Sequence, residues 1–255
     1  MDLRLDSISH AYGETQVLDG ISLDIPSGRI VCVIGPSGCG KSTLLRMVGG
    51  LERPDQGSIV QMGAAPAGCL NPLTYIFQDF ALLPWRSVAG NVELVLEDHP
   101  LTRAERRDII DDVLRRTGLI EFRDTLPKNL SGGMKQRVAI ARALAVKPTV
   151  WLMDEPLSAL DAQTRELLMD DLVGLWSREA FTALYVTHNL AEAVRLGHQI
   201  VVLSRRPGRI REIVEVRTPL EARKTADPQL EAHQRRLWQL IRDEAQAADR
   251  ELVNG

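Results

Sequence analysis

The apolar positions in the first third of the chain predict a series of short strands. Residues 29–35 (RIVCVIG) form a strand-like apolar run that ends in a glycine-rich loop and is followed by a helical pattern, STLLRMVGG. The order strand, loop, helix, strand predicts an α/β sheet whose ligand lies at the strand ends. The other strand-like segments in this part of the chain are LRLDSIS (3–9), ISLDI (21–25), SIVQM (58–62) and LTYIFQ (73–78).

The pattern changes after Pro84, and residues 87–146 are almost wholly helical. Within them, Thr102 is a plausible N-cap with Glu105 three residues later, and Gly118 is a stop signal. Because no strand signal interrupts this stretch, it is interpreted as a helical subdomain inserted into the α/β body. Sheet character then returns at 149–154, 183–188, 199–204 and 209–216, with a helix from about 162 to 178.

The tail from Pro219 onward is charged and is predicted to be helical. Leu230, Leu237 and Ile241 fall on one apolar stripe of that helix. We expect the stripe to pack on the domain's own surface, and dimerisation through it is the alternative.

The composition is that of an ordinary globular protein and excludes several functional classes. Of 255 residues, 44% are hydrophobic and 25% are charged, and the net charge of −3 gives no overall signal for nucleic acid. No apolar run approaches the length of a membrane span, and MDLRLDSISH lacks the apolar core of a secretory signal. Three cysteines without paired spacing predict no disulfide framework and a reducing compartment, the cytosol.

The glycine-rich loop GPSGCGKST, residues 35–43, carries the most specific chemistry of the first half. It matches the pattern G-x-x-x-x-G-K-[ST] with a strand before it and a helix after it, as a phosphate loop requires. Its backbone N–H groups would surround the phosphates, Lys41 would reach the β- and γ-phosphates, and the Ser42 hydroxyl would bind Mg²⁺. The expected ATP-binding residues are Gly35, Pro36, Ser37, Gly38, Cys39, Gly40, Lys41, Ser42 and Thr43.

Four further polar positions gain meaning from their place beside strands. The strand-like VWLMDE ends in Asp154, a candidate Mg²⁺ ligand, and Glu155, a candidate base for the attacking water. Gln78 follows another strand and has an amide oxygen suited to Mg²⁺ or a water, while His188 closes ALYVTH and would face the γ-phosphate. Tyr12 is a candidate platform for a purine base. Each is weak alone, since strands often end in acids, a lone glutamine is by default a surface residue, a lone histidine is more often structural, and a tyrosine in a strand is ordinary.

A second glycine-rich segment, LSGGMKQ (130–136), opens the helical run MKQRVAIARALAV. Ser131, Gly132 and Gly133 thus form a helix N-terminus with little side chain, which is suited to the approach of an anion. The chain already carries one phosphate loop, so this segment needs an explanation of its own.

Taken together and in this order, these motifs resemble the ATP-binding-cassette (ABC) ATPases along the chain up to about Gly208. LSGGMKQ is similar to the signature of that family and is far more specific than the phosphate loop. The matching positions are Tyr12 in the aromatic A-loop, Lys41 in Walker A, Gln78 in the Q-loop, Ser131, Gly132 and Gly133 in the signature, Asp154 and Glu155 in Walker B, residues 158–161 in the D-loop, and His188 as the switch histidine.

The resemblance implies a P-loop NTPase fold with a RecA-like core, an antiparallel β subdomain and an inserted α-helical subdomain. It places the ATPase domain at 1–218, the helical subdomain at about 86–147 and a C-terminal helical tail at 219–255. It implies ATP hydrolysis in a head-to-tail homodimer, with Lys41, Gln78, Glu155 and His188 as catalytic residues. ATP bound to one copy would be capped in trans by Ser131, Gly132, Gly133 and Asp161 of the other, and Ser42, Gln78 and Asp154 would hold Mg²⁺.

Two segments sharpen the resemblance toward one subfamily. QDFALLPWRSVAGNVEL (78–94) and LSRRPGRI (203–210) are similar to the cassettes that power importers of nitrate, sulfonates and taurine. The absence of a TEVGE-like segment before the signature, where DTLPKN stands, favours import. The resemblance implies a peripheral location at the cytoplasmic face of the inner membrane, permease subunits contacting residues 78–91, and a separate solute-binding protein. Phe80, Leu82, Leu83 and Trp85 form an apolar cluster there, for packing or for the permease.

Three alternatives differ in partner or in chemistry. The cassette could serve a lipid or export system with the same catalysis. A soluble ABC ATPase of DNA repair or translation is disfavoured, because the insertion is short and there is one cassette. A non-catalytic interaction protein is disfavoured by the presence of Lys41, Glu155 and His188.

Overall fold

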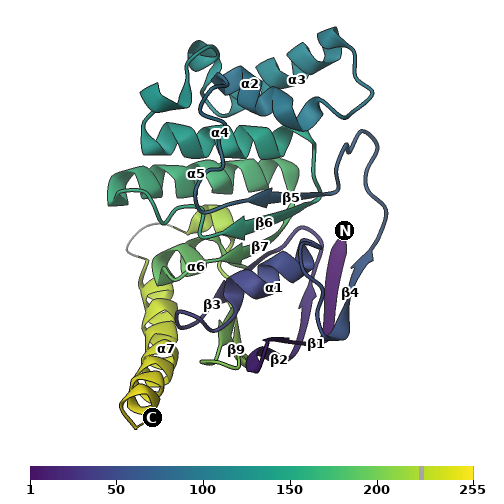
Figure 1. Ribbon diagram of the computed structural model, residues 1–255. Helices are drawn as coiled ribbons and strands as arrows, with labels where there is room; N and C mark the ends of the chain where they lie inside the picture. The colour runs from purple at the N-terminus through teal and green to yellow at the C-terminus, as the bar shows by residue number, and fades with distance from the viewer. Residues whose placement is uncertain (224–226, 255) are drawn as a thin grey trace. The chain divides into compact units, whose positions relative to one another are not determined.

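The computed structural model describes residues 1–223 and 227–254, with side chains in the C-terminal helix up to residue 242 and at Glu244 (Figure 1). Residues 224–226 and 255 of the predicted tail lie outside the described part. The chain divides into two compact units, residues 1–64 with 169–255, and residues 65–168. No helix within the described residues has both the length and the apolar character needed to cross a membrane.

The first unit contains an antiparallel sheet of three strands in the order β2–β1–β4. Polar and apolar residues alternate over much of β1, where the buried ones include Leu3, Leu5 and Ile8. Tyr12 pairs with Thr15 at the tip of the first hairpin, so the second strand begins well before the ISLDI segment that the sequence predicted. The bounds are β1 Asp2–Tyr12, β2 Thr15–Ile25 and β4 Gln56–Met62.

The core of the first unit is built on β3, whose five residues are all buried. Parallel strands lie on both sides of it, β7 on one and β8 on the other, and β9 continues antiparallel to β8. Strands buried on both faces need apolar side chains throughout, which explains the continuous run IVCVI. The bounds are β3 Ile30–Ile34, β7 Thr182–Val186, β8 Gln199–Leu203 and β9 Ile210–Glu215.

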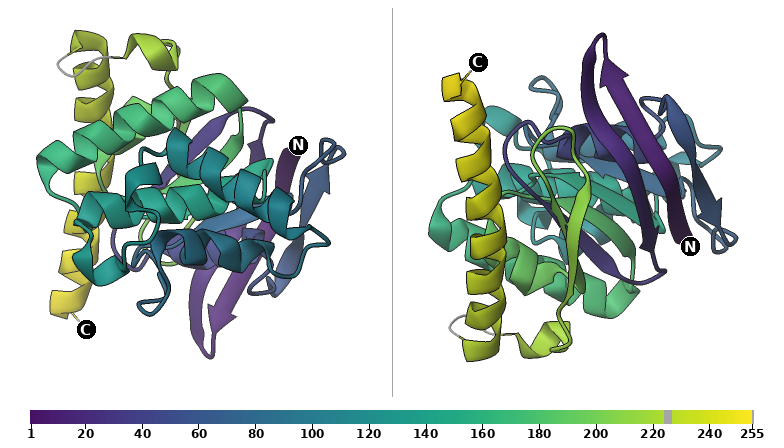
Figure 2. Two further views of the ribbon diagram at one scale, coloured as in Figure 1. Left: turned by 90° about the horizontal axis from the view of Figure 1, so that it is seen from above. Right: turned by 90° about the horizontal axis from the view of Figure 1, so that it is seen from below.

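Among the described residues, four α-helices belong to the first unit in whole or in part. Of the predicted stripe in the C-terminal helix, Leu230 and Leu237 are buried and Ile241 is partly buried. The helix begins at Pro228 and not at Pro219. Figure 2 shows this helix running alongside β9, to which it is hydrogen-bonded. The bounds are α1 Lys41–Val48, α5 Ala162–Glu179 (which starts in the second unit), α6 Leu190–Leu196, the 3₁₀ turn η4 Leu220–Ala222 and α7 Pro228–Asn254.

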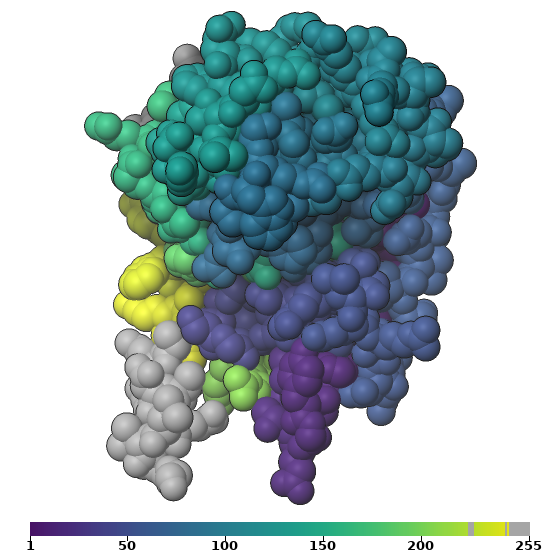
Figure 3. Space-filling model, turned by 45° about the horizontal axis from the view of Figure 1, so that its top comes forward, coloured from purple at the N-terminus to yellow at the C-terminus, as the bar shows by residue number. Residues whose placement is uncertain are grey.

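The second unit joins a pair of parallel strands, β5 and β6, to a run of helices. Thr102 and Glu105 form the predicted capping box at the start of α3, and Gly118 adopts a positive φ of 67° just past its end. The helical residues form a continuous surface, blue to teal in the space-filling view (Figure 3). The bounds are β5 Leu73–Ile76, α2 Val88–Glu93, η1 Leu94–Leu96, α3 Arg103–Arg116, η2 Ile120–Phe122, η3 Pro127–Asn129, α4 Gly132–Ala145 and β6 Val150–Asp154.

Candidate active site

The loop from Gly35 to Gly40 joins β3 to α1 and has glycine at three of its six positions. A Cβ at Gly35 would lie 2.9 Å from Sγ of Cys39 and 3.0 Å from the carbonyl oxygen of Leu203. At Gly40, the N-cap of α1, φ is 101°, and a Cβ would lie 2.6 Å from Cδ2 of Leu18. Glycine is therefore required at both ends of the loop for packing, and at Gly40 also for the backbone conformation.

Lys41 turns its ammonium group back onto this loop. Its Nζ donates hydrogen bonds to the carbonyl oxygens of Gly35 (2.9 Å) and Pro36 (3.0 Å), and the residue is only 7% exposed. Ser37 and Gly38, at the crest of the loop, are exposed, and Ser42 is half-buried in the first turn of α1. A buried cation beside a helix N-terminus and a turn rich in backbone N–H groups is suited to bind phosphate.

Tyr12 lies at the end of β1 with 46% of its surface exposed. Its hydroxyl donates to Oε2 of Glu52 at 2.5 Å, and its ring meets His10 edge-on, with centroids 4.7 Å apart. Burial and the bond to Glu52 raise the pKa of Tyr12, so the phenol stays neutral at physiological pH. A tyrosine that is 46% exposed and anchored at its hydroxyl is suited to stack on an aromatic base.

His188 is an exposed residue in the connection between β7 and α6, and buried bonds fix that connection. The carboxylate of Glu192, which is 2% exposed, accepts hydrogen bonds from the hydroxyls of Thr187 (2.8 Å) and Tyr185 (2.9 Å). Asn189 caps the first turn of α6 with its side-chain oxygen. Because β7 is parallel and adjacent to β3, His188 and the phosphate loop follow the carboxyl ends of neighbouring strands.

Asp154 and Glu155 stand at the carboxyl end of β6 in the second unit. An oxygen of Asp154 accepts a hydrogen bond from the hydroxyl of Tyr75 on β5 at 3.3 Å. Glu155 has a positive φ of 45°, a conformation that costs a non-glycine residue about 1–3 kcal/mol and that concentrates at functional sites. The hydroxyl of Ser158 donates to the carbonyl oxygen of Glu155 at 2.9 Å and closes the turn.

Gln78 is exposed and follows β5, the parallel neighbour of β6, so it shares the carboxyl edge with Asp154. The loop after it is unusual, since Phe80 and Ala81 both have positive φ angles, 60° and 46°. Arg142 of α4 holds this loop by donating to the carbonyl oxygens of both residues. Of the apolar cluster predicted here, Phe80, Leu82 and Leu83 are partly buried, whereas Trp85 is 73% exposed.

The signature segment forms the N-terminus of α4. Ser131 is the N-cap, and its hydroxyl accepts a hydrogen bond from the N–H of Met134 at 3.2 Å. Ser131 and Gly132 are exposed, whereas Gly133 is buried, and a Cβ there would lie 2.5 Å from Cγ2 of Thr164. Gly133 thus has a packing reason to be glycine, in addition to the predicted approach of an anion.

Asp161 makes local hydrogen bonds at the start of α5. Its carboxylate accepts hydrogen bonds from the backbone N–H (3.0 Å) and the hydroxyl (2.7 Å) of Thr164, and these bonds lower the pKa of Asp161. Thr164 therefore connects the predicted D-loop to the signature helix within one unit. It was not predicted as a site residue, although the pattern of an aspartate three residues before a threonine at a helix start is a capping signal.

Comparison with known proteins decides the family. A family model described as ABC transporter matches residues 18–158 of the chain. The chain belongs to the ABC transporter family. The family explains why a phosphate loop, an LSGG segment and a strand ending in Asp-Glu occur together in one chain. Its catalytic activity is ATP hydrolysis.

Individual relatives cover most of this ABC cassette. The aliphatic sulfonates import ATP-binding protein SsuB 1 of Mesorhizobium japonicum is 46% identical and covers 82% of this chain and 77% of its own. The nitrate import ATP-binding protein NrtD of Synechocystis sp. is 43% identical and covers 86% and 84%. A dimeric structure of the cassette MJ0796 with bound ADP and phosphate matches with a TM-score of 0.72 at 32% identity, covering 85% and 100%.

A cavity of about 560 Å³ in the first unit of the cassette is separate from the phosphate loop. It lies around Arg29, which precedes β3, whereas the phosphate loop follows the other end of that strand. Trp176 and His198 also line the cavity, and burial together with Arg223 and Arg29 lowers the pKa of His198 to about 4. His198 is therefore neutral at physiological pH, and its Nδ1 accepts a hydrogen bond from the N–H of Ile30.

Proposed function

We propose that this cassette is the ATP-hydrolysing subunit of an importer for a small anion such as nitrate, a sulfonate or taurine. It would act as a homodimer, peripheral to the cytoplasmic face of the inner membrane, with permease subunits and a separate solute-binding protein as partners. The relatives from Mesorhizobium and Synechocystis, which are named for sulfonate and nitrate import, support this solute class.

The observation that carries the dimer is the exposed N-terminus of α4. Ser131 and Gly132 present a capped, almost bare helix end, while the chain's own phosphate loop is a separate site with its own cation, Lys41. A helix N-terminus attracts anions. In the proposed dimer, Ser131, Gly132, Gly133 and Asp161 of one copy cap the ATP on Lys41 of the other. The dimeric MJ0796 cassette supports this assembly.

Each remaining site residue has a role in the proposed reaction. Tyr12 stacks on the base, and residues 35–43 bind the phosphates, with Lys41 exchanging its carbonyl partners for phosphate oxygens. Glu155 accepts the proton of the attacking water, and His188 stabilises the transferring phosphoryl group. Catalysis then comes from positioning and charge stabilisation. The loop that carries His188 is suited to this role because the buried hydrogen bonds of Glu192 hold it in place.

The donor set fits a magnesium ion that arrives with the nucleotide. Ser42, Gln78 and Asp154 offer a hydroxyl, an amide oxygen and a carboxylate, the hard oxygen ligands that Mg²⁺ prefers. Among the described residues there is no cluster of three or more His, Cys, Asp or Glu side chains that could hold a metal. Mg²⁺ is typically held by one or two protein ligands together with substrate phosphates, where it neutralises developing charge.

We assign the proposed domains and the proposed permease surface to ranges of the chain. Residues 1–218 would form the nucleotide-binding domain, with the helical subdomain at about 86–147, and residues 219–255 the tail. The surface at 78–91 would receive the permease. Trp85 supports this assignment, because its ring is exposed beside a loop with two positive φ angles that Arg142 holds in place.

Mixing two inactive variants tests the head-to-tail site. Ser131→Arg keeps a normal phosphate loop, and Lys41→Ala keeps a normal signature. In a head-to-tail dimer their mixture contains one intact site per heterodimer, so ATP turnover should recover to at most about one quarter of the parent value after random pairing. No recovery at any mixing ratio, with both variants folded, would contradict capping in trans.

A second experiment separates binding from hydrolysis. Glu155→Gln should still bind ATP and should accumulate as an ATP-bound dimer in size-exclusion chromatography, because the base is absent. Steady phosphate release by this variant would show that Glu155 is not the base. Import itself is tested by co-purifying the permease and assaying nitrate, sulfonate and taurine uptake in proteoliposomes with the solute-binding protein.

A further inference from the structure

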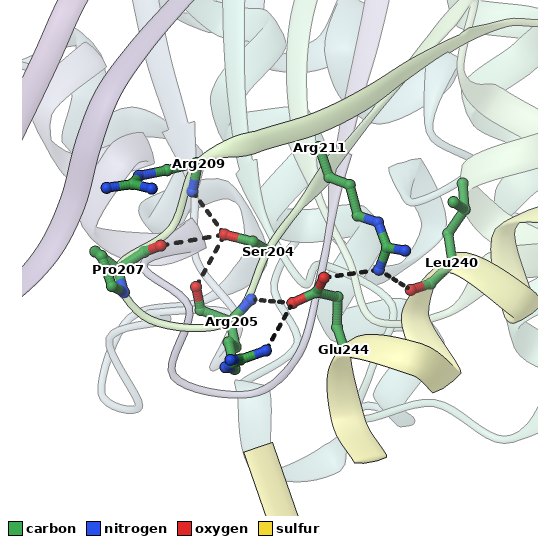
Figure 4. Close-up of polar contacts among 7 residues, drawn as sticks. All are labelled: Ser204, Arg205, Pro207, Arg209, Arg211, Leu240 and Glu244. Atoms are coloured by element: carbon green, nitrogen blue, oxygen red, sulfur yellow. Dashed lines mark hydrogen bonds and ion pairs between the residues drawn. The ribbon is translucent and has the colours of Figure 1, made fainter. Parts of the chain in front are cut away.

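The C-terminal helix α7 is bonded to the loop that follows β8. The carboxylate of Glu244, with 14% of its side chain exposed, accepts hydrogen bonds from the backbone N–H of Arg205 (3.0 Å) and from a guanidinium nitrogen of Arg211 (2.7 Å) (Figure 4). The same nitrogen of Arg211 donates to the carbonyl oxygen of Leu240, one turn earlier in α7. Glu244 therefore connects the helix to the loop at 204–209 and to β9.

The loop at 204–209 is a closed turn with its own hydrogen bonds. The Ser204 hydroxyl lies 2.9 Å from the carbonyl oxygen of Arg205 and 3.1 Å from that of Pro207, and it accepts a hydrogen bond from the N–H of Arg209 (Figure 4). The guanidinium of Arg209 is bonded to Asp19. Because these bonds join the two ends of the turn, we expect the turn to move as a unit when the backbone at Arg205 is displaced.

The other side of this turn lies against the phosphate loop. Nε of Arg206 donates to the carbonyl oxygen of Gly38 at 3.3 Å. At Gly208 a Cβ would lie 2.2 Å from the carbonyl oxygen of Cys39, so the two backbones are in direct contact. The pKa of the Cys39 thiol is raised mainly by burial and, to a smaller extent, by the negative charge of Glu244. Glu244 in α7 is therefore within electrostatic range of the phosphate loop.

We propose that Glu244 is a positioning residue for the phosphate loop, acting through the turn at 204–209 and the bond from Arg206 to Gly38. Gly38 has a positive φ of 76° and no Cβ, so its peptide reorients at little steric expense. The Gly38–Cys39 peptide is planar and trans, so fixing its carbonyl toward Arg206 also fixes its N–H, which donates to the carbonyl oxygen of Pro36 at 3.3 Å and closes the turn of the loop. The conformation of this turn sets the directions of the other backbone N–H groups that a phosphate loop offers to an anion, and α7 thereby sets the affinity for nucleotide.

The test compares nucleotide affinity in variants of the full chain. Glu244→Gln and Arg206→Ala should each raise the Kd for a fluorescent ATP analogue with Mg²⁺ by about three- to tenfold, the range that corresponds to losing one net hydrogen bond. Arg206→Lys, which keeps a charged donor, should recover part of the loss. The matched control is Arg236→Ala. This change removes the ion pair between Arg236 of α7 and Glu212 of β9 but leaves the bonds between α7 and the turn in place.

A second readout reports the loop without any nucleotide. Cys39 is 1% exposed, Cys32 is fully buried and Cys69 is partly exposed. In a Cys69→Ser background, the rate at which a maleimide labels Cys39 measures local opening of the phosphate loop. Glu244→Gln and Arg206→Ala should raise this rate about fivefold or more relative to the parent, and Arg236→Ala should leave it unchanged.

Three outcomes would overturn the proposal. The first is a Kd and a labelling rate in folded Glu244→Gln that equal those of the parent. The second is an effect of Arg236→Ala on Kd and labelling as large as that of Glu244→Gln. The third is full additivity of the two effects in the double variant Glu244→Gln with Arg206→Ala, because the effects of residues that act on one path should not add. The proposal rests on the phosphate loop as the nucleotide site. If the parent chain bound no nucleotide, the proposed function would fail, whereas the labelling of Cys39 would still decide the link to α7.

Discussion

Replacing Gly133 by alanine separates the two reasons for a glycine in the signature helix. Inside a helix, alanine is favoured over glycine by about 1 kcal/mol, so helix propensity alone predicts stabilisation. In this fold, however, the new Cβ would lie 2.5 Å from Cγ2 of Thr164. Carbon atoms in favourable contact are about 3.5–4.0 Å apart, so one of the two segments must shift. We therefore expect Gly133→Ala to destabilise the protein.

The size of the effect follows from the two opposing contributions. Overpacking by one methyl group costs about 1–3 kcal/mol, and the helix gains about 1 kcal/mol, which leaves a net loss of up to about 2 kcal/mol. Thr164→Ser removes Cγ2 but keeps the hydroxyl that donates to Asp161. The next atom near a Cβ at 133 is then Cβ of residue 164, at 3.9 Å, an ordinary contact. Both changes together should thus restore the stability.

Thermal unfolding of the parent, both single variants and the double variant measures this coupling. For a chain of this length each kcal/mol corresponds to about 2–4 °C in Tm, so a coupling of 1–3 kcal/mol is readily detected. Gly132→Ala is the matched control, because its Cβ would meet only the flexible end of Leu160, at 3.3 Å. Additive effects of Gly133→Ala and Thr164→Ser would refute the clash as the cause.

The same double variant also tests the proposed role in trans. Once its stability is restored, any remaining loss of ATP turnover reflects the changed residue 133 in the first turn of α4, next to the exposed helix end that is proposed to meet the second copy's nucleotide. We expect turnover to stay at least tenfold below the parent, which corresponds to about 1.4 kcal/mol. Parent-like turnover would show that the glycine at 133 serves packing only.

Three further predictions concern other parts of the cassette. His198 is protonated near pH 6.5 in the unfolded chain but only near pH 4 in the folded protein, so the folded state loses stability as the pH falls through this window. His198→Gln should flatten that part of a profile of Tm against pH, and an unchanged slope would contradict this explanation. Both amide atoms of Gln136 are buried and unpartnered among the described residues, so Gln136→Met should raise the stability by about 1 kcal/mol; a lower Tm would indicate a partner for the amide. Trp85→Ala should leave Tm and the basal ATPase of the isolated subunit unchanged but lower the stimulation of ATPase by the reconstituted permease; equal losses in both assays would argue against a docking role.

Elements with a complete local signal could be predicted from the sequence. β3 and β6 are continuous apolar runs, α3 carries its capping box, and α5 begins and ends within a residue of the prediction. The first half of β2, TQVLDG, lacks such a pattern and is a strand because it pairs with β1. The segment after Pro219 was predicted to be helical, but Arg223 is buried there and donates to backbone carbonyl oxygens of Val194 and Val216, which no local pattern encodes.

The same distinction applies to the candidate active site. The phosphate loop is recognisable because its chemistry is local: Lys41 binds carbonyl groups only five and six residues away. Contacts made by distant segments leave no such mark, and Arg206 is separated from Gly38 by 168 residues. Thr164 beside Gly133 and Tyr75 beside Asp154 are similar cases. Motifs therefore indicate the residues proposed to touch a ligand, whereas the residues that hold them in place can be identified only from the fold.

The C-terminal helix shows why this difference matters for function. Its apolar stripe, Leu230 and Leu237, was visible in the sequence and explains why α7 docks, but apolar contact is non-directional and tolerates small shifts along the helix. Hydrogen bonds require a defined geometry, and Glu244 makes them with two separate segments. The stripe accordingly accounts for the stability of the docked helix, and Glu244 accounts for its register against the turn at 204–209. A charged residue of a polar helix is thereby bonded to the turn that lies against the proposed phosphate loop.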